Sequence, residues 1–237
     1  MKIALIGYGK MGHEIERIAL ERGHSIVSTI DINNPEEFES EAFRSADVVI
    51  EFTRPETALG NYRKCFSAGL PVVSGTTGWL DQVDEVKHAC EKGQTFFYAS
   101  NFSLGVNLFF ALNKKLADMM NSYPIYNVRM KEMHHIQKLD APSGTAITLA
   151  EDILERLDRK SRWVKETQQS PEDLAIASER TGQVPGFHEV IYESDVDTIT
   201  ISHDAKSRAG LALGAVLAAE FTVGKKGFIG MSDLLGF

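Results

Sequence analysis

A glycine-rich turn joins an apolar strand to an amphipathic helix at the start of the chain, and this junction constrains the fold most. Residues 2–6 (Lys-Ile-Ala-Leu-Ile) are almost wholly apolar, as in a parallel strand buried on both faces. The turn Gly7-Tyr8-Gly9-Lys10-Met11-Gly12 follows, and Ile15, Ile18 and Ala19 then recur at helical spacing. A strand, a glycine turn and a helix in this order indicate the first unit of a parallel α/β sheet.

The same turn has the spacing of a dinucleotide-binding fingerprint. A second predicted strand, residues 25–30, ends at Asp31, so an acidic residue follows G-x-G-x-x-G at the end of the next strand. Gly7 permits the tight turn, Gly9 lets a pyrophosphate approach the backbone, and Gly12 lets helix and strand pack closely. Asp31 would accept hydrogen bonds from the adenosine ribose. The predicted cofactor contacts are Gly7, Tyr8, Gly9, Lys10, Met11, Gly12 and Asp31.

The residues after Asp31 bear on the choice of cofactor. Asp31 is followed by Ile-Asn-Asn, with no lysine or arginine beside it. A 2′-phosphate would meet a carboxylate there without a neighbouring cation, which favours NADH over NADPH. Lys10 could fold over the adenosine side, so NADPH stays open as the alternative.

Strands and helices alternate through five cycles, which predicts a doubly wound parallel sheet. The later strands are residues 46–52, 71–74 and 95–99, and the helices between them are a weak one at 36–43 and others at 55–68 and 79–92. From residue 104 the pattern changes to a run of strands, which predicts a second α+β domain with an open mixed sheet. Its expected elements are a helix at 106–120, a strand at 126–134, a helix to 159, a polar stretch at 160–172, strands near 175–179, 188–193 and 197–203, and a helix at 210–221.

The most chemically dense stretch runs from Glu132 to Ala146 and reads Glu-Met-His-His-Ile-Gln-Lys-Leu-Asp-Ala-Pro-Ser-Gly-Thr-Ala. Imidazoles exchange protons near neutral pH, and the nearby lysine adds a positive charge. Ser143 suits a helix N-cap, so the first helical amides, those of Gly144 and Thr145, would face a carboxylate or phosphate. The segment therefore predicts a proton-donating site that also binds an anion.

This stretch resembles the signature E-x-H-H-x-x-K-x-D-A-P-S-G-T-A of the 4-hydroxy-tetrahydrodipicolinate reductase (dihydrodipicolinate reductase) family, and every fixed position is filled. The resemblance implies reduction by NAD(P)H of a cyclic unsaturated imine with two carboxylates to tetrahydrodipicolinate, in diaminopimelate and lysine biosynthesis. It implies that His134 is the acid/base residue and that Lys138 is a proton donor and charge partner. His135 would hold a substrate carboxylate with the amides of Gly144 and Thr145.

The resemblance extends over nearly the whole chain. It carries a G-T-T motif onto Gly75, Thr76 and Thr77 and an A-x-N-F-S turn onto Ala99, Ser100, Asn101, Phe102 and Ser103, both beside the nicotinamide half of the cofactor. It also implies that the last helix and tail return to the nucleotide domain. The expected domains are therefore residues 1–103 with 211–237 for the dinucleotide, and residues 104–210 for substrate binding and assembly as a homotetramer.

Composition excludes several other classes. The chain has 237 residues and a net charge of −8, which argues against a general nucleic-acid-binding surface. Its two cysteines, Cys65 and Cys90, lie in predicted helices without the spacing of metal ligands, so they are expected to be core thiols and no metal site is predicted. No apolar run is long enough to span a bilayer, and no signal-peptide pattern is seen, so we expect a cytoplasmic protein.

Two other functions remain open. One is another NAD-dependent dehydrogenase, acting on an amino acid or imino acid. The other is a non-catalytic NADH-sensing protein, against which the full catalytic string and the absence of a DNA-reading motif both count. A charged segment at 202–208 contains His203 and Arg208, which could be catalytic, although a hinge or interface role is favoured.

Overall fold

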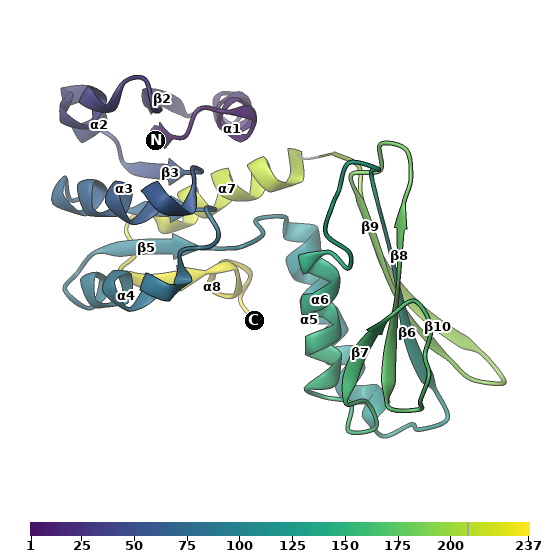
Figure 1. The fold of residues 1–237 in the computed structure, drawn as a ribbon. Helices are drawn as coiled ribbons and strands as arrows, with labels where there is room; N and C mark the ends of the chain where they lie inside the picture. The colour runs from purple at the N-terminus through teal and green to yellow at the C-terminus, as the bar shows by residue number, and fades with distance from the viewer. Residues whose placement is uncertain (208) are drawn as a thin grey trace. The chain divides into compact units, whose positions relative to one another are not determined.

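The computed structural model describes residues 1–207 and 209–237, which form two compact units. The first unit comprises Met1–Leu104 and Ala209–Phe237, and the second comprises Gly105–Arg208. Arg208, considered above for a hinge or interface role, lies outside the described residues. Figure 1 shows a layered α/β arrangement in the first unit and a sheet with helices in the second, which confirms the predicted fold class.

The first unit is built on a six-stranded parallel sheet in the order β11-β5-β4-β3-β1-β2. The five predicted strands are all present, and their carboxyl ends meet at one edge. A sixth strand, β11, was not predicted, because its sequence Gly-Phe-Ile-Gly is too short to show a pattern. The strands are β1 (Lys2–Ile6), β2 (Ser25–Ile30), β3 (Val48–Glu51), β4 (Val72–Ser74), β5 (Thr95–Tyr98) and β11 (Gly227–Gly230).

Helices cover both faces of this sheet (Figure 1). One hydrophobic cluster joins the sheet to α1 and α7, and a second cluster joins its other face to α3 and α4. The predicted helix at 36–43 is instead two short pieces, because Ser40 is extended and its side chain caps the second piece. The helical segments are α1 (Lys10–Glu21), η1 (Pro35–Glu39), α2 (Glu41–Arg44), α3 (Pro55–Ser67), η2 (Leu80–Gln82), α4 (Val83–Glu91), α7 (Ala209–Thr222) and α8 (Met231–Leu235).

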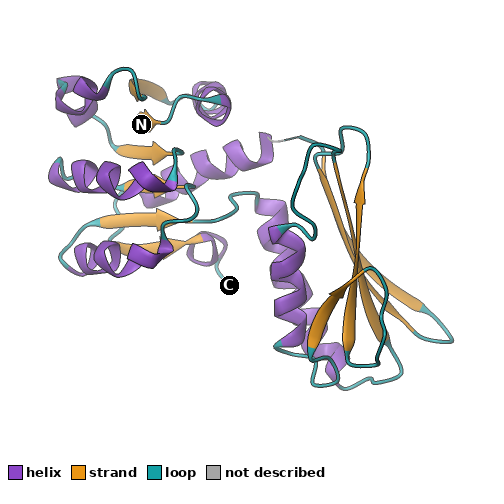
Figure 2. Ribbon diagram, in the orientation of Figure 1, coloured by secondary structure: helices purple, strands orange, loops and turns teal. Residues whose placement is uncertain are grey.

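The second unit is a mixed five-stranded sheet in the order β10-β9-β6-β8-β7, with two helices on one side (Figure 2). Alternate residues of β6 are buried against these helices. Two predictions were wrong here: the helix expected to reach residue 159 ends at Leu154, and the polar stretch contains the edge strand β7. The elements are α5 (Leu104–Asn121), β6 (Asn127–His134), α6 (Gly144–Leu154), β7 (Arg162–Lys165), β8 (Asp173–Arg180), β9 (Gly186–Glu193) and β10 (Thr198–Ala205).

The structure also bears on the two cysteines and on membrane-spanning helices. Cys65 and Cys90 are free and buried, as expected of core thiols, and burial raises the pKa of both. Among the described residues, no helix combines the length and the apolar character that crossing a membrane requires.

Candidate active site

The glycine turn after β1 has the close approaches that its spacing predicts. Gly7 has a φ of +90°, and a Cβ there would lie 2.0 Å from the carbonyl oxygen of Phe52. A Cβ on Gly12 would lie 2.5 Å from the carbonyl oxygen of Gly7, so α1 can begin this close to β1 only with glycine at that position. Gly9 differs, because a Cβ there would meet nothing within 4 Å. Its backbone is open to a ligand at the N-terminus of α1, where no side chain caps the helix.

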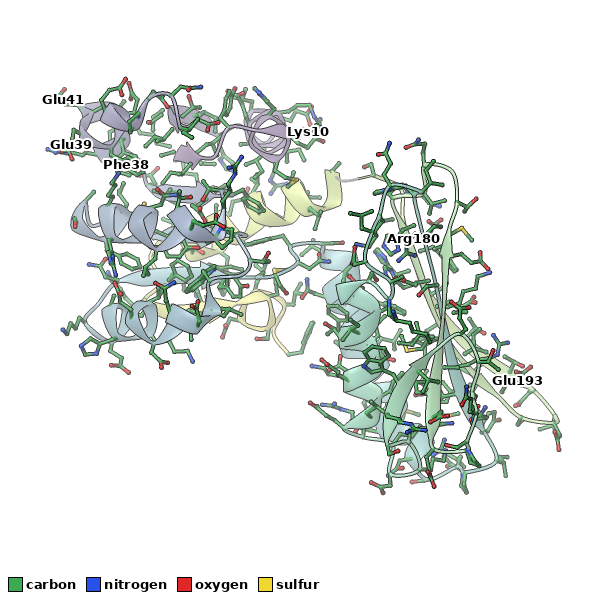
Figure 3. All side chains as sticks on the ribbon, in the orientation of Figure 1. Lys10, Phe38, Glu39, Glu41, Arg180 and Glu193 are labelled. Carbon is green, nitrogen blue, oxygen red and sulfur yellow. The ribbon has the colours of Figure 1, made fainter. Side chains whose placement is uncertain are left out.

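Asp31 is held in a fixed orientation at the end of β2. Its Oδ2 accepts from the amide of Tyr8 at 3.1 Å, and its Oδ1 accepts from the amide of Ile32 at 2.7 Å. The first of these bonds ties the carboxylate to the glycine turn. Figure 3 shows Lys10 at the start of α1. A carboxylate beside an open helix N-terminus is the arrangement that a nucleotide ribose and pyrophosphate require.

Two adjoining cavities follow the carboxyl edge of the first sheet. One, of about 460 Å³, is lined by Asp31 and Ile32 and by two cations, Arg54 immediately before α3 and Lys64 in its last turn. The other, of about 470 Å³, is lined by Gly9, Lys10, Met11, Gly12, Phe52, Thr53, Pro55, Gly75, Thr76 and Thr77. The cavities share Gly9, Phe52 and Thr53, so they form one continuous stretch along this edge. Sequence adjacency could not reveal Arg54 and Lys64, since they reach this cavity from a later helix.

A buried carboxylate organises the second of these cavities. Glu51 is fully buried at the end of β3, and its Oε2 accepts from the hydroxyl of Ser74 at 2.7 Å. Its Oε1 accepts from the hydroxyls of Thr53 and Thr76. Burial raises the pKa of Glu51, although these hydroxyl donors oppose the shift. The sequence showed no sign of this role, because Glu51 lies inside an otherwise apolar strand.

The turn after β5 contributes less side-chain surface than its motif suggests. Ala99 and Phe102 are buried in the core of the first unit, and the Phe102 ring packs against Phe52 with centroids 5.5 Å apart. Asn101 accepts from the amide of Ser103 at 2.9 Å, and Ser100 is exposed. Ala99 and Phe102 can therefore present only backbone atoms to a cofactor.

In the second unit, β6 presents a buried acid beside a histidine. Glu132 is fully buried and His134 is 7% exposed, and both lie on the buried face of the strand, as the alternation predicts. Nδ1 of His134 lies 3.3 Å from Oε2 of Glu132. The strand ends at His134, so His135 belongs to the following turn and is not forced to the opposite face of the sheet.

The start of α6 is tied to the same carboxylate. The Ser143 hydroxyl accepts from the amide of Ala146 at 3.2 Å, which confirms the predicted N-cap. The Ser143 amide lies 3.1 Å from each Glu132 oxygen, and its hydroxyl lies 3.1 Å from Nε2 of His188 on β9. Gly144 and Thr145 follow as the first helical residues, the former exposed and the latter half-buried. This end of α6 is suited to an anion.

Arg180, labelled in Figure 3, holds the loop that carries Lys138. Its Nη2 donates to Glu132 at 3.0 Å and also to the carbonyl oxygen of Asp140, and its Nε donates to that of Lys138 at 3.3 Å. The Lys138 ammonium pairs with Asp140 at 2.9 Å and lowers the pKa of that carboxyl group. The structure thus gathers His134, Lys138 and the α6 N-terminus around Glu132 and Arg180, and sequence reasoning assigned no role to these last two residues.

Two more histidines complete this end of the sheet. Nδ1 of His135 is buried without a hydrogen-bond partner, while the residue as a whole is half-buried. His203 stacks on Phe109, and burial lowers its pKa. Its ring is therefore packed against α5, which favours a structural role over a catalytic one.

One group of side chains has the spacing of metal ligands. Glu132, His134 and His188 bring their ligand atoms within 4.8 Å of one another. The carboxylate is already the acceptor for the Ser143 amide and the Arg180 guanidinium. These contacts explain the burial of the carboxylate without a cation, and we assign no metal to the three side chains.

Comparisons with known proteins cover both units. Residues 1–102 match the family described as dihydrodipicolinate reductase, N-terminus, and residues 105–235 match dihydrodipicolinate reductase, C-terminus. A 4-hydroxy-tetrahydrodipicolinate reductase of Christiangramia forsetii is 49% identical over 236 residues, covering 99% of this chain and 98% of that protein. The chain belongs to the dihydrodipicolinate reductase family.

Other members of the family agree with this placement. A 4-hydroxy-tetrahydrodipicolinate reductase of Staphylococcus saprophyticus is 35% identical over 240 residues, covering 95% of this chain and 96% of that protein. The dipicolinate-bound dihydrodipicolinate reductase from Paenisporosarcina sp. TG-14 has a TM-score of 0.76 at 21% identity, with 98% of each chain covered, and so shares the fold.

Proposed function

We propose that this chain is the reductase that converts 4-hydroxy-tetrahydrodipicolinate, or dihydrodipicolinate, to tetrahydrodipicolinate in diaminopimelate and lysine biosynthesis. The observation that carries the proposal is the cluster at the end of β6, where His134, Lys138 and the N-terminus of α6 come together in a member of this family. A bound pyridine nucleotide supplies the hydride. The protein must then supply a proton and hold two carboxylates.

His134 is the proposed proton donor to the ring that receives the hydride. It ends a strand, it is nearly buried, and a carboxylate lies beside its Nδ1, so the position of its imidazole is well defined. Lys138 is a proton donor and charge partner. Its ammonium must break the ion pair with Asp140 in order to bind the substrate. His135 and the amides of Gly144 and Thr145 hold a substrate carboxylate at the N-terminus of α6.

NADH is the proposed preferred cofactor, with NADPH also accepted. Asp31 is fixed by two backbone amides where ribose hydroxyls can donate to it. A 2′-phosphate would be repelled there. Arg54 and Lys64 line the same cavity, however, and their charges offset part of this repulsion. We therefore propose a moderate preference rather than exclusion of NADPH. Gly75, Thr76, Thr77 and the backbone of Ala99–Phe102 are proposed to hold the nicotinamide half.

We propose that the chain is cytoplasmic and assembles as a homotetramer through the face of the second sheet opposite α5 and α6. Exposed or half-buried residues alternate with buried ones along β6, and Arg129 and Lys131 form ion pairs with Glu193 and Glu179 on that face. Covering such a face by self-association is a common solution. Light scattering of the purified protein tests the tetramer.

Loss of NADH or NADPH absorbance with the freshly made condensation product of pyruvate and aspartate semialdehyde tests the activity. Oxidation of the nucleotide that requires both the protein and the condensation product supports the proposal. Inactivity toward this product with turnover of another amino or imino acid would identify a different dehydrogenase. Tight nucleotide binding with no turnover of any such acid would identify a sensor instead.

A further inference from the structure

We infer that Glu132 is a positioning residue that acts through His134: its carboxylate holds Nδ1 of the imidazole so that Nε2 delivers the proton. This inference rests on the proposed function, because it assigns a role within that reaction. It adds a residue to the site for which neither the signature nor the chemistry of the substrate specified a task.

The position of Glu132 suits a positioning role and excludes direct contact with the substrate. The carboxylate is fully buried, so the substrate cannot reach it without displacing the protein. Its Oε2 faces Nδ1 of His134 at 3.3 Å, from two residues earlier on the same strand. Since residues two apart on a strand share a face, the backbone itself fixes this pairing.

The carboxylate is held on its other sides by donors that do not move with the histidine. The Ser143 amide lies 3.1 Å from both oxygens, and the Arg180 guanidinium donates to Oε1 at 3.0 Å. Burial by itself raises the pKa of Glu132, but the nearby His134 ring and the hydrogen bonds from Ser143 and Arg180 outweigh it and hold the pKa below its ordinary value. Glu132 is thus an anion with a fixed position.

The surroundings of His134 distinguish its two ring nitrogens. Nδ1 faces the carboxylate, whereas Nε2 faces the backbone of Gly186, where a Cβ would lie only 3.1 Å away. The missing side chain at Gly186 keeps space beside Nε2. A carboxylate beside Nδ1 selects the Nδ1–H tautomer of the neutral ring, as carboxylate–histidine pairs do elsewhere. Nε2 is therefore the atom that gives up the proton.

His188 packs against both His134 and the Glu132 carboxylate. Its ring meets the His134 ring edge to face, with centroids 5.0 Å apart, and its Nε2 lies 3.7 Å from Oε2 of Glu132. The bond between Nε2 and the Ser143 hydroxyl holds the ring in place. His188 thus fills the space in which His134 could otherwise rotate away from Glu132.

Glu132→Gln tests the inference, because glutamine keeps the shape and an acceptor for the Ser143 amide but removes the charge. We expect kcat to fall about tenfold or more, a part of the ~100-fold that a positioned proton donor contributes. The KM for NADH should stay within twofold, and the solvent isotope effect on kcat should rise because proton transfer becomes slower. Glu179→Gln is the matched control, because Glu179 also pairs with a cation, Lys131 on the neighbouring strand, at 2.9 Å. This variant should leave kcat unchanged.

A second measurement uses the unaltered protein and is needed if Glu132→Gln does not fold. Nitrogen-15 NMR of histidine-labelled protein, assigned with His134→Gln, should show the Nδ1–H tautomer for neutral His134. An Nε2–H tautomer would overturn the inference. So would an E132Q protein with wild-type kcat and isotope effect, or a loss of activity on chelation that Zn²⁺ restores, since the carboxylate would then be a metal ligand. If the wild-type protein does not reduce the imine at all, the proposed function fails, while the tautomer still reports on Glu132.

Discussion

The backbone amide of Ser143 lies 3.1 Å from both carboxylate oxygens of Glu132, eleven residues earlier in the chain. This contact fastens the start of α6 to the end of β6 through a main-chain group that no substitution at Ser143 except proline can remove. The end of β6, where the proposed proton donor His134 lies, and the N-terminus of α6 are therefore held in one rigid arrangement.

Replacing the cap side chain should separate its local role from its role in the site. Ser143→Ala removes the bond to the Ala146 amide and the one to His188, and we expect about 1 kcal/mol or more of lost stability in urea unfolding. Ser40→Ala removes an equivalent cap from α2, far along the chain in the first unit. Both variants should lose stability, but only Ser143→Ala should raise the KM for the dicarboxylate. An equal effect on KM in both would contradict the placement of substrate at α6.

Removing either proposed proton donor should impair the chemical step selectively. We expect His134→Ala and Lys138→Ala each to lower kcat by about a hundredfold or more, the usual contribution of a positioned acid. Cofactor affinity, measured by fluorescence titration with NADH, should barely change, since the proposed cofactor contacts lie in the first unit. Near-normal kcat in both variants would show that the roles are assigned to the wrong residues.

Local sequence signals predicted most of the fold because each rests on a local physical cause. The strand of residues 2–6 is apolar because both its faces are covered, Gly7 is required by its own φ of +90°, and Gly12 is required by its close approach to the carbonyl oxygen of Gly7. β7 was missed for the opposite reason. Arg162 to Lys165 is a short, half-exposed edge strand, and its pairing with β8 rather than its own pattern makes it extended.

The site was predictable only where its residues are consecutive. The segment from His134 to Thr145 was visible as one string, whereas Arg180 and His188 come from β8 and β9 and meet Glu132 only through strand pairing. The cofactor cavity shows the same limit. Asp31 follows from the fingerprint, but Arg54 and Lys64 reach it from another helix, so the charge around a 2′-phosphate could not be judged from the residues next to Asp31.

A methyl group at Gly9 should weaken the binding of the nucleotide without disturbing the fold. A Cβ there meets no protein atom within 4 Å, and it lies at the helix N-terminus where we propose that the pyrophosphate binds. We expect Gly9→Ala to raise the KM for NADH about tenfold, equivalent to roughly 1.4 kcal/mol, with thermal stability nearly unchanged. Gly60→Ala in α3 is the control, because its Cβ also meets nothing, and it should stabilise the helix by up to about 1 kcal/mol without changing KM. An unchanged KM in Gly9→Ala would place the pyrophosphate elsewhere.

Removing the charge of Asp31 should change which nucleotide is preferred. Asp31→Asn removes the negative charge and one of the two acceptor oxygens for the ribose hydroxyls, and with the charge the repulsion of a 2′-phosphate, so kcat/KM should fall for NADH and rise for NADPH. The chemical step at saturating cofactor should stay nearly intact. Lys64→Met, which removes a cation from the same cavity, should reduce kcat/KM for NADPH more than for NADH. If the ratio of the two kcat/KM values were the same in wild type and both variants, the adenosine ribose would have to bind away from this cavity.

Stability should fall with acid partly because of His188. Burial, followed by the neighbouring His134, lowers the pKa of His188 to about 4, although Glu132 opposes the shift; His203 and Lys138 also face it and lower it further. The unfolded chain, with a histidine pKa near 6.5, binds this proton first, so folding stability is full above pH 6.5 and is lost as pH falls toward 4. The loss between pH 7 and pH 5 is about 2 kcal/mol from this group. His188→Gln should therefore reduce the difference in unfolding free energy between these two pH values by about that amount, whereas His88→Gln on the exposed surface of α4 should behave as wild type. An unchanged difference in His188→Gln would mean that His188 is protonated in the folded protein, beside Glu132.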